Sequence, residues 1–239
     1  MREGLIMMDH QFDRPIYADT PIIIISRDRL SYLTCLISWL EKAGHNNIII
    51  CDNQSTYEPM LDFLRNTKHK VYHSDINSHL APWETGLVDE HCAGKNYVVT
   101  DCDVIPTEDC PSNVLDFFSK ALEEFTDINK VGLSLKIDDL PECYINKEKV
   151  QRWEGQFWRY KRSEQFFQAQ LDTTFALYRA GTGHDLNNAL RAAPPYSARH
   201  LPWYSNSTEP TEEEEYYFIH ASKSIATWTN KPVKQDHII

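Results

Sequence analysis

Short segments that are apolar at nearly every position constrain the fold of this protein most. Three of them are Ile22–Ile25, Ile48–Cys51 and Tyr97–Thr100, and Lys70–His73 is a more polar run of the same kind. A strand that is hydrophobic on both faces is typical of a parallel sheet covered by helices on both sides. Leucines at helical spacing within residues 30–40 predict one such helix between the first two runs.

The order of these segments predicts an α/β fold. Strands and helices alternate at the spacing of β-α-β units, which indicates an open, mostly parallel central sheet with helices on both faces. The 239 residues, 41% of them hydrophobic, suit a single domain spanning residues 1–239. The other predicted elements are helices at 60–64, 83–92, 151–167 and 212–222, strands at 131–135 and 172–178, and a loop at 192–207. The acidic run Glu212–Glu215 is typical of a solvated helix face.

The net charge excludes one large class of partner. A formal charge of −11 repels a phosphate backbone, so we expect no nucleic acid as a partner. Nucleotide binding remains compatible with this charge, because one bound cation supplies positive charge locally.

Cysteine spacing and segment lengths bear on the cellular compartment. None of the six cysteines forms a CxxC pair, so neither a zinc ribbon nor a thioredoxin-like site is indicated. The first residues lack the apolar core of a secretory signal, and no apolar run is long enough to span a bilayer. We therefore expect a cytoplasmic location, no transmembrane segment and free thiols.

The sharpest chemical feature is the pair Asp101 and Asp103, which directly follows the apolar run Tyr97–Thr100. In an open parallel sheet, ligands bind at the carboxyl ends of the strands. Hard cations such as Mn²⁺ and Mg²⁺ take oxygen ligands, often one or two carboxylates together with substrate phosphates. The pair therefore predicts a Mn²⁺ or Mg²⁺ site. A surface turn with two unrelated acids is the alternative, whereas an EF-hand is excluded by Pro106 and Ser112 at the positions of its glycine and final glutamate.

The order of these motifs resembles the GT-A glycosyltransferases, especially the family-2-like group. The matching segments are 48–56 (IIICDNQST), the D-x-D stretch 86–103 and 170–179 (QLDTTFALYR), and the resemblance spans residues 21–228. It implies a GT-A (Rossmann-like) fold. The nucleotide-sugar-binding half is then expected at about residues 20–105 and the acceptor-binding half at about residues 106–239.

The resemblance also implies roles on the donor side. Ser26 and Asp28 would line the nucleobase pocket, and Asp52 would hydrogen-bond the base or the ribose. Asp101 would face the ribose or a water on the metal, and Asp103 would ligate the metal directly. The residues themselves leave structural alternatives open, because Ser26 and Asp28 also suit helix caps and Asp52 suits a turn.

Three further residues complete the predicted site. His220 resembles the late histidine that often completes the metal site in this family, although a single histidine is commonly structural. Asp172 lies where the family carries its catalytic base, but the acid pair of many inverting members is reduced here to one acid followed by two threonines. Arg199 lies with His200 in the predicted loop, where the pair is placed to bind the diphosphate. Trp153 and Trp158 suit either the core or a stacking platform for an acceptor sugar.

The resulting hypothesis is a metal-dependent, inverting glycosyltransferase. The donor would be a UDP- or GDP-sugar, with UDP favoured, and the acceptor a hydroxyl of a glycan or another molecule. A haloacid-dehalogenase-like phosphatase is the alternative enzyme, although Ile105 stands where that family has Thr or Val. A catalytically inactive GT-A binding module and a nucleotidyltransferase also remain open, the latter without its usual glycine-rich loop after the first strand.

Overall fold

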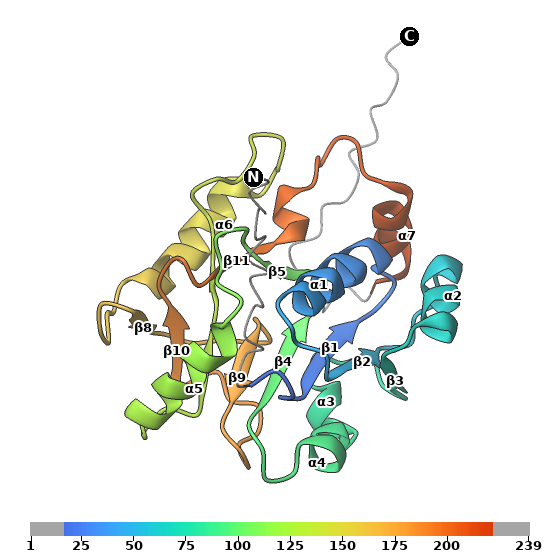
Figure 1. Ribbon diagram of the computed structural model, residues 1–239. Coiled ribbons are helices and arrows are strands. Elements are labelled where there is room, and N and C mark those ends of the chain that lie inside the picture. The colour runs from blue at the N-terminus through green and yellow to red at the C-terminus, as the bar shows by residue number, and fades with distance from the viewer. Residues whose placement is uncertain (1–16, 222–239) are drawn as a thin grey trace, which may run out of the picture.

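The apolar runs form the centre of an eight-stranded, mostly parallel sheet in a computed structural model that describes residues 17–221 (Figure 1). The strand order is β3-β2-β1-β4-β9-β6-β10-β8. The strands are β1 (Ile22–Ser26), β2 (Ile48–Asp52), β3 (Lys70–His73), β4 (Tyr97–Asp101), β6 (Lys130–Gly132), β8 (Phe166–Gln168), β9 (Ala176–Tyr178) and β10 (Ala189–Ala192). Strand β9 runs antiparallel to both neighbours, β4 and β6, and therefore joins two parallel parts of the sheet. This architecture confirms the predicted α/β class with one large sheet.

A small second sheet lies next to the end of β4. It consists of β5 (Val104–Pro106), β11 (Ser197–His200) and β7 (Ser134–Leu135), with β11 in the middle. Strand β11 pairs with β5 in the antiparallel direction, opposite the residues that immediately follow the D-x-D pair. A segment from late in the chain is thereby fixed beside the two aspartates.

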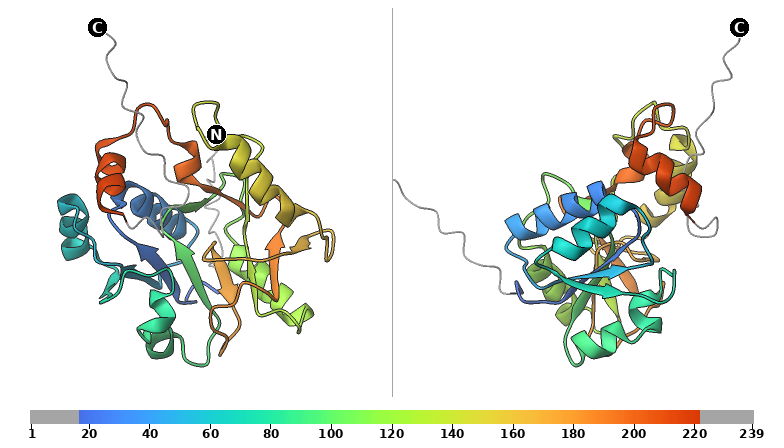
Figure 2. Two further views of the ribbon diagram at one scale, coloured as in Figure 1. Left: turned by 180° about the vertical axis from the view of Figure 1, so that it is seen from behind. Right: turned by 90° about the vertical axis from the view of Figure 1, so that its right-hand side faces the viewer.

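Helices cover both faces of the large sheet, as the all-apolar strands predict (Figures 1 and 2). In β1, Ile22 and Ile24 belong to one apolar cluster and Ile23 and Ile25 to a second one on the opposite face. Each fully buried side chain of this size contributes about 1.5–3 kcal/mol to folding. The first cluster is closed by α1 (Leu30–Lys42), α2 (Glu58–Asn66) and α5 (Val114–Glu124), and the second by α3 (Ala81–Glu84) and α4 (Leu87–Cys92).

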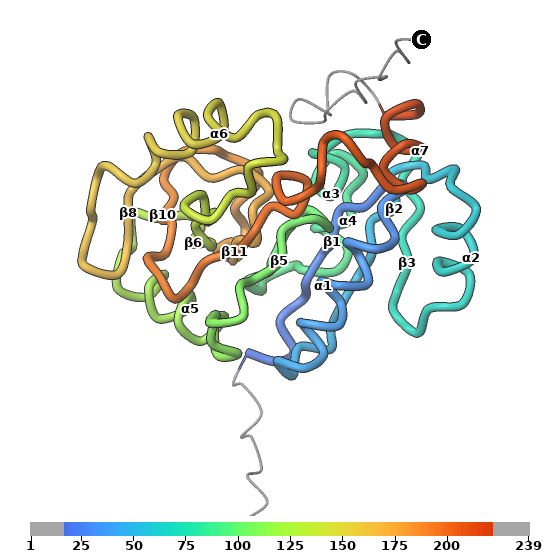
Figure 3. Tube along the Cα trace, turned by 90° about the horizontal axis from the view of Figure 1, so that it is seen from above, coloured from blue at the N-terminus to red at the C-terminus, as the bar shows by residue number. Residues whose placement is uncertain are grey.

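The remaining helices lie beyond the carboxyl ends of β1 and β4. They are α6 (Lys147–Glu154), followed by the 3-10 helix η1 (Gly155–Trp158), and α7 (Glu212–His220), preceded by the 3-10 helix η2 (Leu201–Tyr204). Seen along this edge, α6 lies toward β8 and β10, and α7 toward β1 and β2 (Figure 3). No helix within residues 17–221 is long and apolar enough to cross a membrane.

Helix α7 docks on the amino-terminal end of α1. Glu213 accepts hydrogen bonds from the Ser31 backbone nitrogen at 3.0 Å and from the Ser31 hydroxyl at 2.5 Å. Glu214 accepts one from the Tyr32 hydroxyl at 3.1 Å. Glu213 therefore caps a neighbouring helix whose first N–H groups need acceptors. In the acidic run predicted to be a solvated helix face, Glu212 and Glu215 are exposed, whereas Glu213 and Glu214 are only partly exposed.

Several predicted boundaries differ from the structure. The helix predicted at 83–92 is two short helices, because Gly86 adopts a left-handed backbone with φ of 77°. The strand predicted at 131–135 divides into β6 and β7, which belong to different sheets. The predicted loop at 192–207 contains β11 and η2. The strand predicted at 172–178 begins only at Ala176, and the residues before it form a turn at the edge of the sheet.

Gly132, at the end of β6, is packed directly under this turn. A Cβ atom on Gly132 would lie 2.9 Å from the carbonyl oxygens of Thr174 and Phe175 and 2.7 Å from the Leu171 side chain. Two of these three contacts are with backbone, which cannot rotate away. Because Gly132 has no side chain, the segment that carries Asp172 packs directly against β6.

Gly132→Ala should destabilise the protein by about 1–3 kcal/mol, the usual cost of an overpacked core. The free energy of unfolding, measured with denaturant, checks this value. Gly155→Ala is the matched control, because a Cβ there meets nothing within 4 Å. Equal stability of the two variants would contradict the packing described here.

Candidate functional site

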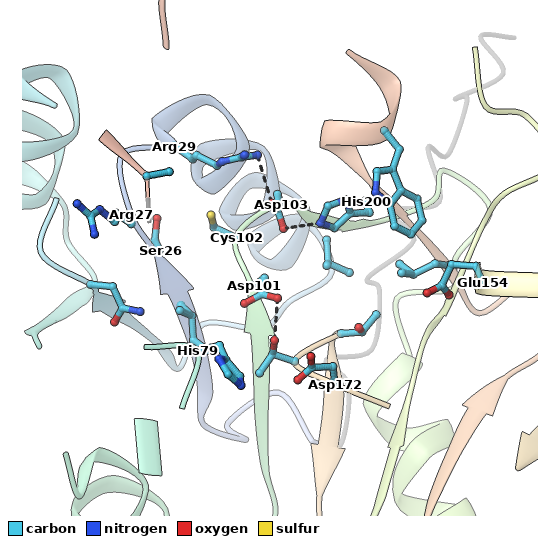
Figure 4. Close-up of a pocket in the computed structure, with 18 of the residues that line it drawn as sticks. Ser26, Arg27, Arg29, His79, Asp101, Cys102, Asp103, Glu154, Asp172 and His200 are labelled. Carbon is cyan, nitrogen blue, oxygen red and sulfur yellow. Dashed lines mark hydrogen bonds and ion pairs between the residues drawn. The ribbon is translucent and has the colours of Figure 1, made fainter. Parts of the chain in front are cut away.

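A cavity of about 470 Å³ opens at the carboxyl edge of the large sheet (Figure 4). The loop after β1 and the D-x-D pair line it from the first half of the chain, and Glu154, Asp172, Arg191 and His200 line it from the second. The cavity therefore lies where the two predicted halves meet. In α/β sheets this edge is the usual place for ligands.

Asp101 is held rigidly at the end of β4. Its backbone N–H donates to the carbonyl oxygen of Thr173 at 2.9 Å, and the Thr173 hydroxyl donates to Asp101 Oδ2 at 2.7 Å. Burial, and secondarily the nearby charge of Asp103, raise the pKa of Asp101 well above its usual value. A positive group in the cavity would favour the charged form of this carboxyl.

Asp103 presents its two carboxylate oxygens to different partners. Oδ2 lies 3.3 Å from a guanidinium nitrogen of Arg29. Oδ1 is buried and has no hydrogen-bond partner among the described residues, and His200 Nε2 lies 3.6 Å from it, beyond hydrogen-bond distance. Burial lowers the pKa of His200, which favours the neutral imidazole that binds metals.

These groups fit a divalent cation. An unpaired buried carboxylate oxygen facing a neutral imidazole is costly unless a partner fills the space between them. Asp101, Asp103 and His200 do not bring their ligand atoms within 4.8 Å of one another in the part of the chain that the structure describes. The protein would therefore supply Asp103 and His200 as direct ligands, leaving other positions to phosphate and water, as is common for Mg²⁺.

Two arginines after β1 add positive charge to this acidic protein. Arg27 and Arg29 both line the cavity. The Arg29 guanidinium is buried and lies 3.8 Å from the centre of the Tyr217 ring, so α7 fixes its position. No function was predicted for these arginines from the sequence. Two basic residues directly after a buried strand were the available signal.

The predicted nucleobase residues are placed differently from one another. Ser26 lines the cavity. Asp28 does not line it, because its buried carboxylate accepts hydrogen bonds from the backbone nitrogens of Thr56 at 2.6 Å and Tyr57 at 2.8 Å. These bonds tie the loop after β1 to the start of α2, which is the structural alternative for this residue.

Asp52 also forms local bonds. Its Oδ1 accepts from the Ser55 backbone nitrogen at 3.2 Å, and its Oδ2 lies 3.1 Å from His73 Nδ1. The next residue, Asn53, lines the cavity, whereas Asp52 does not. The end of β2 therefore offers the amide of Asn53 to the cavity, a group for which no role was predicted from the sequence.

Arg199 and His200 lie on opposite faces of β11, because side chains alternate along a strand. Arg199 points away from the D-x-D pair and forms ion pairs with Glu108 at 2.6 Å and Asp139 at 2.8 Å. It lines a second cavity of about 660 Å³ instead. The structure thus brings His200 to Asp103 and leaves Arg199 outside the first cavity.

His220 is exposed at the end of α7. Its Nδ1 lies 2.8 Å from the carbonyl oxygen of Tyr216, and its ring stacks on the Tyr216 ring. It does not line the first cavity. The structure does not bring the histidine predicted as a metal ligand to the aspartates, and His200 occupies that position.

Asp172 lines the first cavity with an exposed carboxylate. Its Oδ1 lies 3.2 Å from His184 Nε2. The next residue is Thr173, which bonds to Asp101, so the two acids belong to one connected unit. A carboxylate that is accessible in the cavity and close to the D-x-D pair is able to take a proton from a bound molecule.

The far wall of the cavity contains a buried ion pair under aromatic rings. Arg191 lies 2.7 Å from Glu154 and 4.0 Å from the centre of the Phe157 ring. Trp153 lines this wall and is 52% exposed, a fraction that leaves its ring free to stack on a ligand. Trp158, the other predicted platform, packs against Phe167 and lines the second cavity.

No protein-family model matches the chain, and no curated protein matches it either. Among solved structures, 23 chains match, and one of them is a cytidylyltransferase from Leptospira borgpetersenii. It shares 11% sequence identity with this chain, with a TM-score of 0.36, over 57% of this chain and 71% of that one. A similarity this low assigns no activity to the chain.

Proposed function

We propose that this protein is a metal-dependent glycosyltransferase that moves a sugar from a nucleoside-diphosphate sugar to a hydroxyl acceptor. The observation that carries the proposal is the unpaired Asp103 oxygen facing neutral His200 at the carboxyl end of β4, with Arg27 and Arg29 beside the same cavity. Carboxylate, imidazole and arginines in one cavity match the needs of a diphosphate and its cation.

The donor would bind along the β1, β2 and β4 ends. Ser26 and Asn53 are the polar side chains there that line the cavity, and we assign them to the nucleoside. Arg27 and Arg29 would contact the diphosphate as charge-assisted donors. Asp103 and His200 would hold Mn²⁺ or Mg²⁺, which when bound supplies Lewis-acid stabilisation of the departing diphosphate. UDP remains the favoured nucleotide.

The acceptor would bind on the opposite wall. Asp172 reaches into the cavity from that side and is the residue we assign as the base that removes the acceptor proton. Trp153 would stack on the apolar face of an acceptor sugar. The Glu154–Arg191 pair would hydrogen-bond its hydroxyls. A base opposite the leaving group makes the reaction a single displacement with inversion.

The site offers less support to a phosphatase that uses Asp101 as a nucleophile. Asp101 Oδ2 is occupied by the Thr173 hydroxyl, and burial raises the pKa of the carboxyl, which reduces its nucleophilic form. The broadest test is a thermal-shift screen of nucleotide sugars, each with and without Mn²⁺, because a ligand that binds only the folded state raises the melting temperature. Hydrolysis or transfer of the stabilising sugar then separates an enzyme from an inactive binding module, and turnover of a generic phosphoester identifies a phosphatase.

Asp103→Asn should abolish the Mn²⁺-dependent part of nucleoside-diphosphate binding and the transfer reaction. The amide removes the charge that a hard cation requires. Calorimetry with UDP, with and without Mn²⁺, gives the measurement, and Asp89→Asn on the exposed side of α4 is the control. Normal transfer by Asp103→Asn in a chelator-treated assay would rule out the metal site.

The two late histidines give a second, matched pair of variants. His200→Asn should weaken the Mn²⁺-dependent binding, whereas His220→Asn should leave it unchanged, because only His200 lies beside Asp103. The same calorimetric titration measures both variants. The opposite ranking would restore the role that the sequence predicted for His220.

Asp172→Asn should bind the donor nearly as well as the original protein and transfer sugar about 10²–10⁴-fold more slowly, the usual loss for a general base. Steady-state rates and donor affinity check this split, and NMR of the product should show the anomer opposite to that of the donor. A rate within a few-fold of the original, or retention of configuration, would remove Asp172 from this role.

A further inference from the structure

A second group of metal-ligating side chains lies beside the D-x-D pair. Ligand atoms of His79, Asp172 and His184 all lie within 4.8 Å of one another. The three residues come from three separate loops: the one before α3, the turn before β9 and the loop between β9 and β10. The fold, rather than local sequence, brings them together.

Contacts with neighbouring aromatic residues hold the loop that carries His184 in place. The His184 ring packs against Trp83 with ring centres 5.2 Å apart. The Trp83 indole donates to the Tyr97 hydroxyl at 2.9 Å, and that hydroxyl donates to the carbonyl oxygen of Thr182 at 2.5 Å. This chain of contacts fixes the position of the His184 ring, as supporting contacts commonly do for a ligating histidine.

A hydrogen bond also holds the segment that carries His79. The carbonyl oxygen of the preceding residue, Ser78, accepts from the Asn53 side chain at 2.7 Å, while the His79 side chain itself is exposed. Its edge faces the His184 ring, with ring centres 5.8 Å apart. The backbone before His79 is therefore held in place, and a ligand atom of its ring lies within 4.8 Å of those of His184 and of Asp172, which lines the same cavity (Figure 4).

The distances suit a small ion held by nitrogen and oxygen. Two atoms that each lie about 2.1 Å from a tetrahedral ion are about 3.4 Å apart. His184 Nε2 and Asp172 Oδ1 are 3.2 Å apart. Two imidazoles and one carboxylate select borderline ions such as Zn²⁺ rather than Mg²⁺, which prefers oxygen ligands.

We propose that His79, Asp172 and His184 form a zinc site, distinct from the Asp103–His200 site. Three protein ligands leave at least one position of Zn²⁺ open toward the cavity, where a water or a bound anion would complete the coordination. The proposal that Zn²⁺ binds here rests on this geometry alone. One consequence rests on the proposed function: Zn²⁺ on Asp172 occupies the carboxylate that the acceptor needs, so zinc would inhibit transfer at the acceptor step.

The test uses the full chain, freed of metal with a chelator, and Co²⁺ as a spectroscopic substitute for Zn²⁺. Co²⁺ should bind saturably and give visible d–d absorption that Zn²⁺ removes and Mg²⁺ does not. His79→Ala and His184→Ala should each weaken Co²⁺ at least about tenfold. His91→Ala is the control, because this histidine also has a carboxylate neighbour, Glu90, at 3.4 Å.

The variants separate this site from the others. Asp103→Asn should keep the Co²⁺ spectrum, and the absence of a strong thiolate charge-transfer band should exclude the free cysteines as ligands. No saturable binding, or equal affinity in His79→Ala, His184→Ala and His91→Ala, would overturn the proposal. His79 is exposed, so its variant keeps the test valid even if His184→Ala does not fold. Because no nucleotide or sugar is present, the result is independent of the proposed transfer reaction.

Discussion

The rest of the site depends on the two hydrogen bonds between Asp101 and Thr173. They connect residues 72 positions apart in the sequence, at the point where the parallel strands meet antiparallel β9. A third hydrogen bond connects the same two segments: the Phe175 backbone N–H donates to the Thr100 hydroxyl at 3.3 Å. These hydrogen bonds hold Asp101 and Asp172, the residue before Thr173, in a fixed arrangement at the edge of the cavity. The close packing of the turn before β9 against Gly132 also supports these hydrogen bonds.

The site also balances charge in a small space. Four carboxylates, those of Asp101, Asp103, Glu154 and Asp172, line one cavity of an already acidic protein. Arg29 offsets part of this charge through its ion pair with Asp103, and its burial under Tyr217 makes that offset permanent. Arg191 pairs with Glu154 in the same way. Burial, and after it the charge of Asp103, raise the pKa of Asp101 well above its usual value, so a bound cation would favour the charged form of this carboxyl.

The first half of the fold could be predicted from sequence because its signals are local. Strands that are apolar on both faces, as in Ile22–Ile25, identify the sheet without any knowledge of partners. The D-x-D position could be predicted for the same reason, since it follows such a strand. The second half could not, because β11 is only four residues long and is stabilised by pairing with β5, about ninety positions earlier in the chain. Arg199 and His200 were assigned together to the diphosphate because no signal in the sequence indicated the strand whose alternation separates them. Likewise, Asp28 and Asp52 were assigned to a ligand, while the structure uses both in loop bonds that require neighbours 28 and 21 residues away.

The docking of α7 on α1 has a consequence for the order in which the protein can mature. The contact between Glu213 and Ser31 closes a loop of 182 residues, so it forms only after α7 has left the ribosome. Until α7 has emerged, Arg29 lacks the Tyr217 ring that covers it, and the first turn of α1 lacks its acceptor. A nascent chain can thus assemble the whole central sheet before the Arg29 side of the cavity takes its final form. Emergence of α7, rather than formation of the sheet, is the event that finishes this side of the cavity.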